Sequence, residues 1–359
     1  MTEQVITTIE QVSTTWLTRV LRRSGALTQG EVVDVAIDST ERILSTSNRI
    51  RIAYSDDAEG QLLARLFLKT VDADMEDETF GPSEVNYYTR DYLDLAGAPI
   101  PRCYDALFSE EERRYHLLLD DLSETHIEAK HREPTLEYGL DLAEAFACLH
   151  AHRWRARRFG EFGDRLPAEE QIARFVEVAR PGAGHILGEF SSELKPHWPA
   201  AIDEILRFHP AAMINRARDD NGFTLIHGDP NWNNILVPRN AGKPIYLIDR
   251  QPFDWSLTVW LGAYDLAYSL VLDWDVYKRR RHETAVLRHY YDQLLARGVA
   301  DYSWEKLWDD YRLSVAICVY VAIEWCRGGI NHAWTHVWLP MLQQALTACD
   351  DLNCRELWM

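Results

Sequence analysis

The sequence has no apolar run long enough to cross a membrane as a helix. A membrane-spanning helix needs about 20 consecutive apolar residues, whereas the longest run here, Val315 to Ile323, stops at Glu324. We therefore predict a buried helix at this position and no membrane partner. The chain also shows no internal repeat and no low-complexity segment.

Signals for secretion and for covalent cross-linking are missing too. The first residues, Met1 to Gln4, lack the basic start and apolar core of a signal peptide, which predicts a cytoplasmic location. The six cysteines form no C-x-x-C pair and no zinc-ligand spacing. A chain of 359 residues can build a large hydrophobic core without disulfides, so we expect reduced thiols.

Positive charge is scarce relative to negative charge. The chain has 38 basic and 56 acidic residues, which gives a net charge of −18. Such an acidic protein is poorly suited to bind the phosphate backbone of nucleic acid, and its charge permits a cationic small-molecule partner. We predict no nucleic-acid partner, and we expect the short basic clusters 153–158 and 278–281 to be solvated helix faces.

The apolar residues follow different periods in the two parts of the chain. Residues 8–24 show helical spacing and predict an amphipathic helix, and a second helix is expected over 83–95. Helical periodicity dominates from Leu136 onward, apart from 222–250, which reads as strand, loop, strand. Four further segments alternate or run apolar and predict antiparallel strands: 32–37, 49–54, 62–71 and 114–119. This pattern predicts an α+β protein with a sheet-rich part and a larger helical part.

The most informative polar motif is the stretch 227–234, HGDPNWNN, followed by Leu247-Ile248-Asp249. Phosphoryl transfer asks little covalent chemistry of a protein, because catalysis consists mainly of positioning a hydroxyl and neutralising charge with Mg²⁺. An Asp that takes the hydroxyl proton, an Asn five residues later and a second Asp on a nearby strand can do both. The spacing follows the protein-kinase pattern, with Gly228 where a protein kinase has Arg.

This motif resembles the H-G-D-x-x-x-x-N signature of the aminoglycoside phosphotransferase and choline kinase-like enzymes, which are small-molecule kinases with a two-lobed protein-kinase-like fold. His227, Gly228, Asp229 and Asn234 fill every fixed position. The resemblance implies an N-terminal nucleotide-binding lobe with an antiparallel sheet over residues 1–120. It also implies a mostly helical catalytic and substrate-binding lobe over 121–359, with ATP and Mg²⁺ as cofactors.

The resemblance implies a role for each residue of the motif. Asp229 would be the catalytic base, and Asn234 and Asp249 would bind Mg²⁺, which prefers oxygen ligands. His227 would brace the loop, and Asp265, in a D-L-A element, would support it from below. Without the resemblance, an Asn or Asp at such positions is also typical of a turn or a strand-end cap.

The nucleotide half of the site is expected upstream of this motif. Lys69 ends an apolar strand, and Glu84 opens the helix that follows, so the resemblance implies that Lys69 binds phosphates and Glu84 holds it. Glu78 is the alternative partner for Lys69. Residues 46–48 stand where a kinase has its phosphate-covering loop, but they contain no glycine, and an ordinary hairpin turn is the alternative. The other candidate nucleotide-binding residues are Ser47, Asn48, Leu119 and Asp120, the last two beside a hinge near residue 121.

Tryptophan is concentrated in the C-terminal part, where the resemblance implies the acceptor pocket. Nine of the thirteen tryptophans lie from Trp255 to the C-terminus. Aromatic faces with nearby carboxylates bind ammonium groups through cation–π attraction, although helical tryptophans are also common in protein cores. The candidate acceptor-binding residues are Asp254, Trp255, Asp273, Trp274, Glu324 and Trp325.

The leading hypothesis is an ATP-dependent phosphotransferase that acts on a hydroxyl of an aminoglycoside-like antibiotic or a related amino compound, which would confer antibiotic resistance. Alternatives are a kinase of an amino alcohol, a sugar or a steroid-like metabolite. A different class is a non-catalytic pseudokinase that binds nucleotide. Arg250, which follows Asp249 where many relatives have an aromatic residue, predicts either altered local packing or a phosphate contact.

Overall fold

The chain forms two compact units. The computed structural model describes residues 4–42, 45–75, 78–156, 166–240 and 242–359. Unit 1 comprises Met1–Ile127, Pro238–Gly242 and Pro252–Asp254, and unit 2 comprises Glu128–Val237, Lys243–Gln251 and Trp255–Met359. The sequence predicts one boundary, between residues 120 and 121, and does not predict the two later segments that return to unit 1. A sheet in unit 1 and helices in unit 2 confirm the α+β class.

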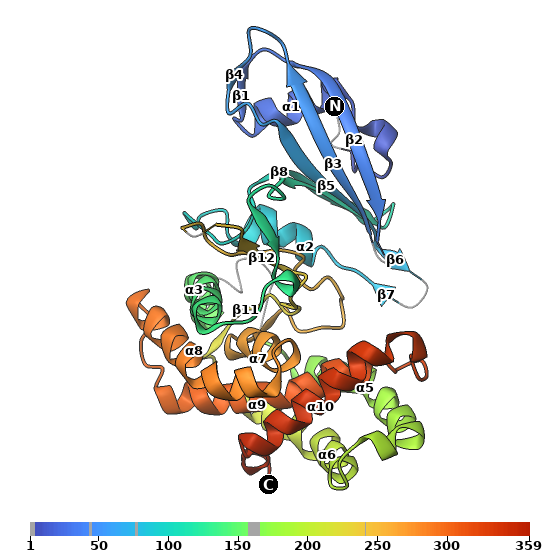
Figure 1. Cartoon of the computed structure of the whole chain (residues 1–359), viewed down its shortest axis with the longest axis vertical. Helices are drawn as coiled ribbons and strands as arrows, with labels where there is room; N and C mark the ends of the chain where they lie inside the picture. Colours follow the sequence, from blue (N-terminus) through green and yellow to red (C-terminus); the bar gives the residue numbers. More distant parts are fainter. Residues whose placement is uncertain (1–3, 43–44, 76–77, 157–165, 241) are drawn as a thin grey trace. The chain divides into compact units, whose positions relative to one another are not determined.

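Unit 1 is built on a five-stranded antiparallel sheet. Its strands are β2 (Val32–Glu41), β3 (Ser45–Tyr54), β5 (Arg65–Asp72), β8 (Cys103–Ser109) and β9 (Arg114–Asp120). They lie in the order β2-β3-β5-β9-β8 (Figure 1). Side chains alternate between the two faces of a strand, so Lys69 projects from the face opposite the buried Leu66 and Leu68. The shorter strands of unit 1 are β1 (Leu27–Gln29), β4 (Glu59–Gly60), β6 (Asp74–Met75) and β7 (Glu78–Thr79), and β10 (His126–Glu128) crosses the boundary between the units.

The first predicted helix begins later than expected. Helix α1 (Thr14–Arg23) starts after Ser13, whose hydroxyl accepts a hydrogen bond from the backbone N–H of Trp16 at 3.1 Å. An N-cap of this kind fixes the start of a helix, and Ile9–Gln11 form a separate 3₁₀ turn, η1. Trp16 and Leu17 are buried in the core beneath the sheet.

The helix predicted for residues 83–95 is wrong beyond Asp91. The short helix α2 (Ser83–Asn86) continues as a π-helical turn, η2 (Tyr87–Asp91). Tyr92 then leaves the helical conformation, with φ −130° and ψ 16°. The ring of Tyr87 packs edge to face on Tyr88 and Tyr92, with centroids 5.1 and 5.4 Å away. Packing of these three rings replaces the regular helical spacing that the sequence suggests.

The loop expected at residues 46–48 is also wrong, because these residues lie inside strand β3. They pair with β2 on one side and with β5 on the other, so that Ser47 is opposite Lys69. Asn48 is 2% exposed, accepts a hydrogen bond from Ser39 Oγ at 2.6 Å and donates one to the Leu68 carbonyl at 3.2 Å. The amide is thus satisfied within the sheet, which makes a polar residue acceptable in a strand.

Unit 2 is mostly helical. Its long helices are α3 (Leu136–His152), α5 (Glu169–Glu189), α6 (Trp198–Arg216), α7 (Ala263–Leu272), α8 (Val276–Ala296), α9 (Trp304–Glu324) and α10 (Thr335–Asp351) (Figure 1). Short 3₁₀ turns are η3 (Ala129–His131), η4 (Trp154–Ala156), η5 (Ser191–Glu193), η6 (His332–Trp334) and η7 (Cys354–Leu357). The predicted buried segment forms the C-terminal half of α9. Among the described residues, no helix combines the length and apolarity of a membrane span. All six cysteines are free thiols, as predicted.

The segment 222–250 begins with a strand and a loop, as predicted, but it contains two further strands where the sequence predicts one. Strand β11 (Phe223–Leu225) pairs with β14 (Val259–Leu261), and β12 (Ile235–Pro238) pairs with β13 (Tyr246–Leu247). Two backbone hydrogen bonds link the polar motif to the segment that follows β13. Ile248 N–H donates to the Asn234 carbonyl at 2.9 Å, and Gln251 N–H donates to the His227 carbonyl at 3.1 Å.

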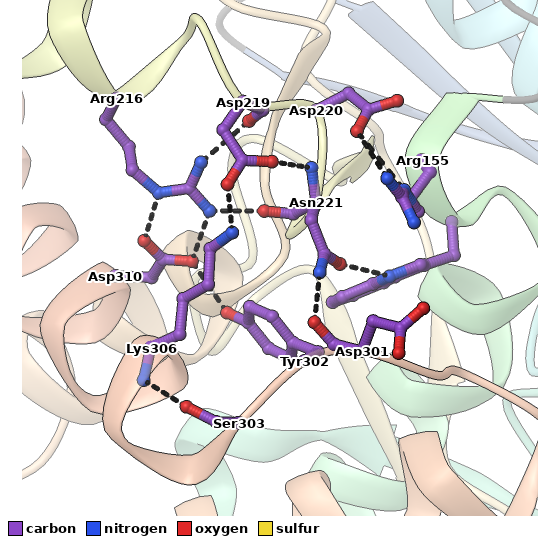
Figure 2. A network of polar contacts seen from close by, with 11 residues as sticks. Arg155, Arg216, Asp219, Asp220, Asn221, Asp301, Tyr302, Ser303, Lys306 and Asp310 are labelled. Atoms are coloured by element: carbon purple, nitrogen blue, oxygen red, sulfur yellow. Dashed lines mark hydrogen bonds and ion pairs between the residues drawn. The ribbon is translucent and has the colours of Figure 1, made fainter.

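A polar network fixes the turn that leads into β11 (Figure 2). Arg216, at the end of α6, donates two hydrogen bonds to the carboxylate of Asp310 on α9, at 2.6 and 2.8 Å. Tyr302 donates a third to Asp310 at 2.7 Å. Gly222 has φ +108°, and a Cβ there would lie 2.8 Å from the Asp310 carboxylate, so the turn admits no side chain at that position. The network anchors the strand that carries the polar motif.

Candidate active site

In unit 1, Lys69 and Glu84 form a partly buried ion pair. Lys69 Nζ lies 2.8 and 2.9 Å from the two carboxylate oxygens of Glu84. The Tyr115 hydroxyl donates to Glu84 Oε2 at 2.5 Å, and the Glu84 side chain is 1% exposed. Glu84 is therefore fixed by two donors. The Lys69 side chain is 12% exposed, and the Glu84 carboxylate orients its ammonium group.

Leu119 and Asp120 lie at the end of strand β9. Leu119 is buried, and the Asp120 carboxylate accepts a hydrogen bond from the Tyr104 hydroxyl at 2.5 Å. The backbone N–H of Asp120 donates to the Arg102 carbonyl at 3.0 Å. These contacts fix the backbone at the predicted hinge, and nucleotide contacts by the two residues stay predictions.

In unit 2, the carboxylate of Asp229 accepts three hydrogen bonds from neutral donors. Oδ1 accepts from the Tyr268 hydroxyl at 2.7 Å and from Asn231 Nδ2 at 3.0 Å. Oδ2 accepts from Asn234 Nδ2 at 3.1 Å, and the same amide group donates to the Asp229 backbone carbonyl at 2.9 Å. Asp229 and Asn234, predicted from their spacing, are thus in direct contact.

Burial makes Asp229 a stronger base than an exposed aspartate. Loss of hydration raises its pKa to about 6, while the hydrogen bonds from Tyr268, Asn231 and Asn234 act in the opposite direction. The nearby charge of Asp249 adds to the rise. The carboxylate is therefore still ionised at neutral pH, with a proton affinity suited to general-base chemistry.

The loop that carries Asp229 is held from below by helix α7. The carboxylate of Asp265, which has no exposed surface, accepts hydrogen bonds from the backbone N–H groups of His227 at 2.6 Å and Gly228 at 3.0 Å. His150 Nε2 contacts the same carboxylate at 3.0 Å, and His150 Nδ1 lies 2.9 Å from the Tyr290 hydroxyl. A chain of buried polar groups therefore runs from α8 through α3 and α7 to the loop.

Neighbouring residues explain why a histidine stands at position 227 and a glycine at position 228. His227 is buried, and its Nε2 lies 2.7 Å from the Ile248 carbonyl, which ties the loop to the segment that carries Asp249. Gly228 has φ +84°, and a Cβ there would lie 2.8 Å from the Cβ of Gln251. The arginine that protein kinases have at this position would be strained here and would displace Gln251.

Asn234 and Asp249 offer oxygen ligands of the kind that Mg²⁺ prefers. They lie at the ends of paired strands β12 and β13, joined by the hydrogen bond from Ile248 to Asn234. Asp249 has φ +57°, a left-handed conformation that Asp tolerates better than most residues. No cluster of three His, Cys, Asp or Glu side chains able to hold a metal occurs in the described ranges. One carboxylate and one amide oxygen suit Mg²⁺, which takes its other ligands from phosphate and water.

Arg250 packs inside unit 2. Its side chain is 1% exposed, and Nε donates to the Ile226 carbonyl at 3.1 Å. The guanidinium also reaches the Thr258 carbonyl at 3.5 Å. Of the two alternatives that the sequence leaves open, these contacts favour local packing, because the charged group binds backbone carbonyls next to the ends of the paired strands β11 and β14.

Among the candidate acceptor residues of unit 2, Asp273 interacts electrostatically with Asp229. Burial raises its pKa well above the ordinary value, the charge of Asp229 adds to the rise, and the backbone N–H of Trp232 opposes it. Its Oδ2 is buried and has no hydrogen-bond partner among the described residues. Trp274 is 2% exposed and stacks on Tyr138 with centroids 5.8 Å apart, which makes it part of the core.

The remaining candidates lie at the surface. Asp254, in a segment of unit 1, is exposed. In unit 2, Arg327 lies over the ring of Trp255, 5.9 Å from its centroid, and forms an ion pair with Glu324 at 3.1 Å. Trp325 packs against the exposed Trp334, with centroids 5.7 Å apart. In unit 2, Trp255, Trp325 and Trp334 belong to a partly exposed aromatic surface.

Two residues of the site, Tyr268 and His150, were not predicted from the sequence. Tyr268 contacts the Asp229 carboxylate, and His150 contacts Asp265, yet neither belongs to the motif. Tyr268 follows Asp265 by three residues on α7, so helical spacing places both on the face that meets the loop. That spacing is the signal that could have identified Tyr268. His150 lies 115 residues before Asp265, and its contact depends on tertiary packing.

Comparison with known proteins identifies a family and a fold. The model of the ecdysteroid kinase-like family matches residues 44–298. Similar solved structures are a choline kinase from Cryptosporidium parvum (11% identity, TM-score 0.58, 96% of this chain and 98% of that chain covered) and the Plasmodium vivax ethanolamine kinase (12%, 0.56, 90% and 84%). A spectinomycin phosphotransferase in complex with ADP and spectinomycin is also similar (12%, 0.53, 94% and 98%).

At these identities the solved structures show the fold, which is the predicted protein-kinase-like fold of small-molecule kinases. Comparison with curated protein sequences gave no match. The resemblance to aminoglycoside phosphotransferases and choline kinases is therefore confirmed at the level of the fold, and the family match is more specific. Because that match covers more than half of the 359 residues, the chain belongs to the ecdysteroid kinase-like family.

Proposed function

We propose that the protein is an ATP-dependent kinase that transfers the γ-phosphoryl group to a hydroxyl of a small molecule. The observation that carries this proposal is the arrangement of Asp229, Asn234 and Asp249 on adjoining segments of unit 2. A proton acceptor beside two oxygen ligands is what phosphoryl transfer requires of a protein. The family match and the ion pair between Lys69 and Glu84 support the same reaction.

In this proposal, Lys69 binds the phosphates of ATP. The two hydrogen bonds to Glu84 hold the ammonium in one place, and Tyr115 holds Glu84. Mg²⁺, when bound, would neutralise charge on the phosphates, and Asn234 and Asp249 would hold it through their side-chain oxygens. Leu119 and Asp120 keep their proposed nucleotide contacts at the end of β9. Ser47 would contact the nucleotide through its hydroxyl, because the backbone of Ser47 and Asn48 pairs with β2 and β5. The Asn48 amide is engaged in the sheet, so Asn48 would only support this contact.

Asp229 acts as the base. It takes the proton of the acceptor hydroxyl as the hydroxyl oxygen bonds to the γ-phosphorus. The bond from this phosphorus to the bridging oxygen breaks, and ADP leaves with that electron pair. A pKa of about 6 lets Asp229 stay ionised at neutral pH and still accept the proton during transfer.

The acceptor that we propose first is an amino compound, such as an aminoglycoside-like antibiotic or an amino alcohol. Asp273 supports this class, because its buried carboxylate would be ionised most readily beside a cationic group. The aromatic surface around Trp255 and Trp325 would pack on the acceptor through cation–π contacts. A polyhydroxylated steroid is the second candidate, favoured by the family match.

Turnover with a panel of acceptors tests the proposal. Purified protein with Mg²⁺ and γ-labelled ATP is offered aminoglycosides, amino alcohols, amino sugars and hydroxylated steroids, and label transfer to one class is the expected result. Asp229→Ala should abolish transfer and keep nucleotide binding. Nucleotide binding without turnover on any acceptor or on water would contradict the proposal and would favour a pseudokinase.

A further inference from the structure

We propose that Tyr268 is a positioning residue that fixes the catalytic carboxylate, so that Oδ2 of Asp229 is the atom that receives the proton. This inference rests on the proposed function. It goes beyond the motif, because Tyr268 belongs to helix α7 and acts through Asp229.

The two carboxylate oxygens of Asp229 accept different numbers of hydrogen bonds. A carboxylate oxygen offers two lone pairs in the plane of the group. Oδ1 accepts from Tyr268 at 2.7 Å and from Asn231 at 3.0 Å, so both of its positions are used. Among the described residues, Oδ2 accepts from Asn234 alone, at 3.1 Å. One position on Oδ2 therefore stays open for the hydroxyl of the acceptor.

Tyr268 is suited to hold the carboxylate because it is itself held. It is 6% exposed and lies on α7, whose ten residues are all buried. The next residue, Ser269, donates its hydroxyl to the Pro230 carbonyl at 2.8 Å, so the same turn of helix also fixes the loop backbone. Burial raises the pKa of Tyr268 well above its ordinary value, which keeps its hydroxyl protonated and able to donate.

Rotation of the Asp229 side chain would exchange the two oxygens and misalign the open position. A correctly oriented catalytic group speeds a reaction because the reacting atoms meet without further loss of freedom. Removal of the Tyr268 hydroxyl should therefore lower kcat and leave the affinity for nucleotide unchanged. A tyrosine with a purely structural role would change stability and leave kcat per folded molecule unchanged.

Tyr302 provides a matched control. Its hydroxyl also donates to an aspartate of unit 2 at 2.7 Å, but that aspartate, Asp310, belongs to the network that anchors β11 (Figure 2). Tyr268→Phe and Tyr302→Phe each remove one buried hydroxyl and keep the ring. Each variant thus loses one hydrogen bond of the same length to a carboxylate. The carboxylate that loses it is Asp229 in one variant and Asp310 in the other.

The experiment measures hydrolysis of Mg·ATP, with water as the acceptor, for wild type and both variants, together with their melting temperatures. One lost hydrogen bond to a charged group predicts a fall in kcat of about tenfold or more in Tyr268→Phe, with a KM for ATP within about twofold of wild type. Tyr302→Phe should keep kcat within about twofold. Asn231→Ala, which removes the other donor to Oδ1, should lower kcat in the same way.

Each result bears on the proposal. Equal kcat in Tyr268→Phe and Tyr302→Phe, while Asp229→Ala is inactive, would overturn the role of Tyr268 and leave the proposed function standing. Full activity in Asp229→Ala would overturn both. If Tyr268→Phe folds poorly, the kcat of folded Asn231→Ala decides, since a value equal to wild type would also overturn the proposal.

Discussion

Two aspartates of unit 2 accept a tyrosine hydroxyl at the same distance and differ in their other partners. Tyr268 donates to Asp229 and Tyr302 donates to Asp310, both at 2.7 Å. Asp310 also accepts two hydrogen bonds from the guanidinium of Arg216 (Figure 2). The other described donors to Asp229 are neutral amides.

The difference shows how a counter-charge separates a structural carboxylate from a reactive one. Burial raises the pKa of both groups, and at Asp310 the Arg216 guanidinium opposes this rise by direct charge interaction. The negative charge of Asp310 is therefore satisfied within the protein. Asp229 has hydrogen bonds and no cationic partner among the described residues, so its affinity for a proton stays available for chemistry.

The largest effect is expected when the reactive carboxylate is removed. Asp229→Asn keeps the shape of the side chain and loses the base, and general-base catalysis contributes about 10²–10⁴-fold. We expect kcat for Mg·ATP turnover to fall by that factor with nucleotide binding retained, measured by label release and by titration with a fluorescent nucleotide. Turnover above about a tenth of wild type would contradict the assignment of Asp229.

Removal of the counter-charge should damage stability instead of catalysis. Arg216→Ala leaves the Asp310 carboxylate buried without its cation, which predicts a loss of about 3–5 kcal/mol in the free energy of unfolding. Arg155→Ala is the control, because its ion pair with Asp220 is 37% and 44% exposed and is expected to contribute about 1 kcal/mol or less. Equal losses in urea unfolding of the two variants would contradict the structural role of the buried pair.

The uncompensated charge of Asp229 should itself cost stability. The pKa of Asp229 in the folded protein, about 6, lies above the pKa of about 4 in the unfolded chain. The folded state therefore binds the proton more tightly, and its free energy of unfolding decreases as pH rises from about 4 to about 6. Asp229→Asn avoids this loss and should be more stable than wild type at pH 7 by about 1–3 kcal/mol. The difference should shrink toward zero near pH 4, as measured by urea unfolding, and an asparagine variant less stable at pH 7 would oppose this account.

The sequence predicted those site residues that belong to a motif with a recognisable order and spacing along the chain. Asp229, Asn234 and Asp249 have a fixed spacing, and Lys69 and Glu84 stand at predictable points of a strand and a helix. Contacts that depend on packing between distant elements were not predictable. Tyr268 meets Asp229 because α7 packs against the loop, and Asn48 lies in a strand because neighbouring strands satisfy its amide.

Two predictions from local sequence patterns were wrong because contacts between distant residues determine the structure there. In the sequence, Trp274 lies between two aspartates, a pattern that suggests a pocket for a cationic acceptor. In the structure, its ring packs on Tyr138 in the core. The helix predicted after Ser83 changes to a π-helical turn where three tyrosines pack together. In both cases, aromatic packing outweighs the pattern of polar and apolar residues along the chain.

The pH dependence of turnover tests the central claim most directly. If Asp229 is the base, kcat/KM for Mg·ATP turnover, which reports the ionising groups of the free enzyme, should fall as pH drops through about 6, by about tenfold per unit below it, because the protonated carboxyl cannot accept the hydroxyl proton. The residual rate of Asp229→Asn should show no such fall over the same range. A wild-type rate that is constant between pH 5 and pH 8, or a variant that keeps the wild-type profile, would contradict the claim that an uncompensated carboxylate at Asp229 drives the reaction.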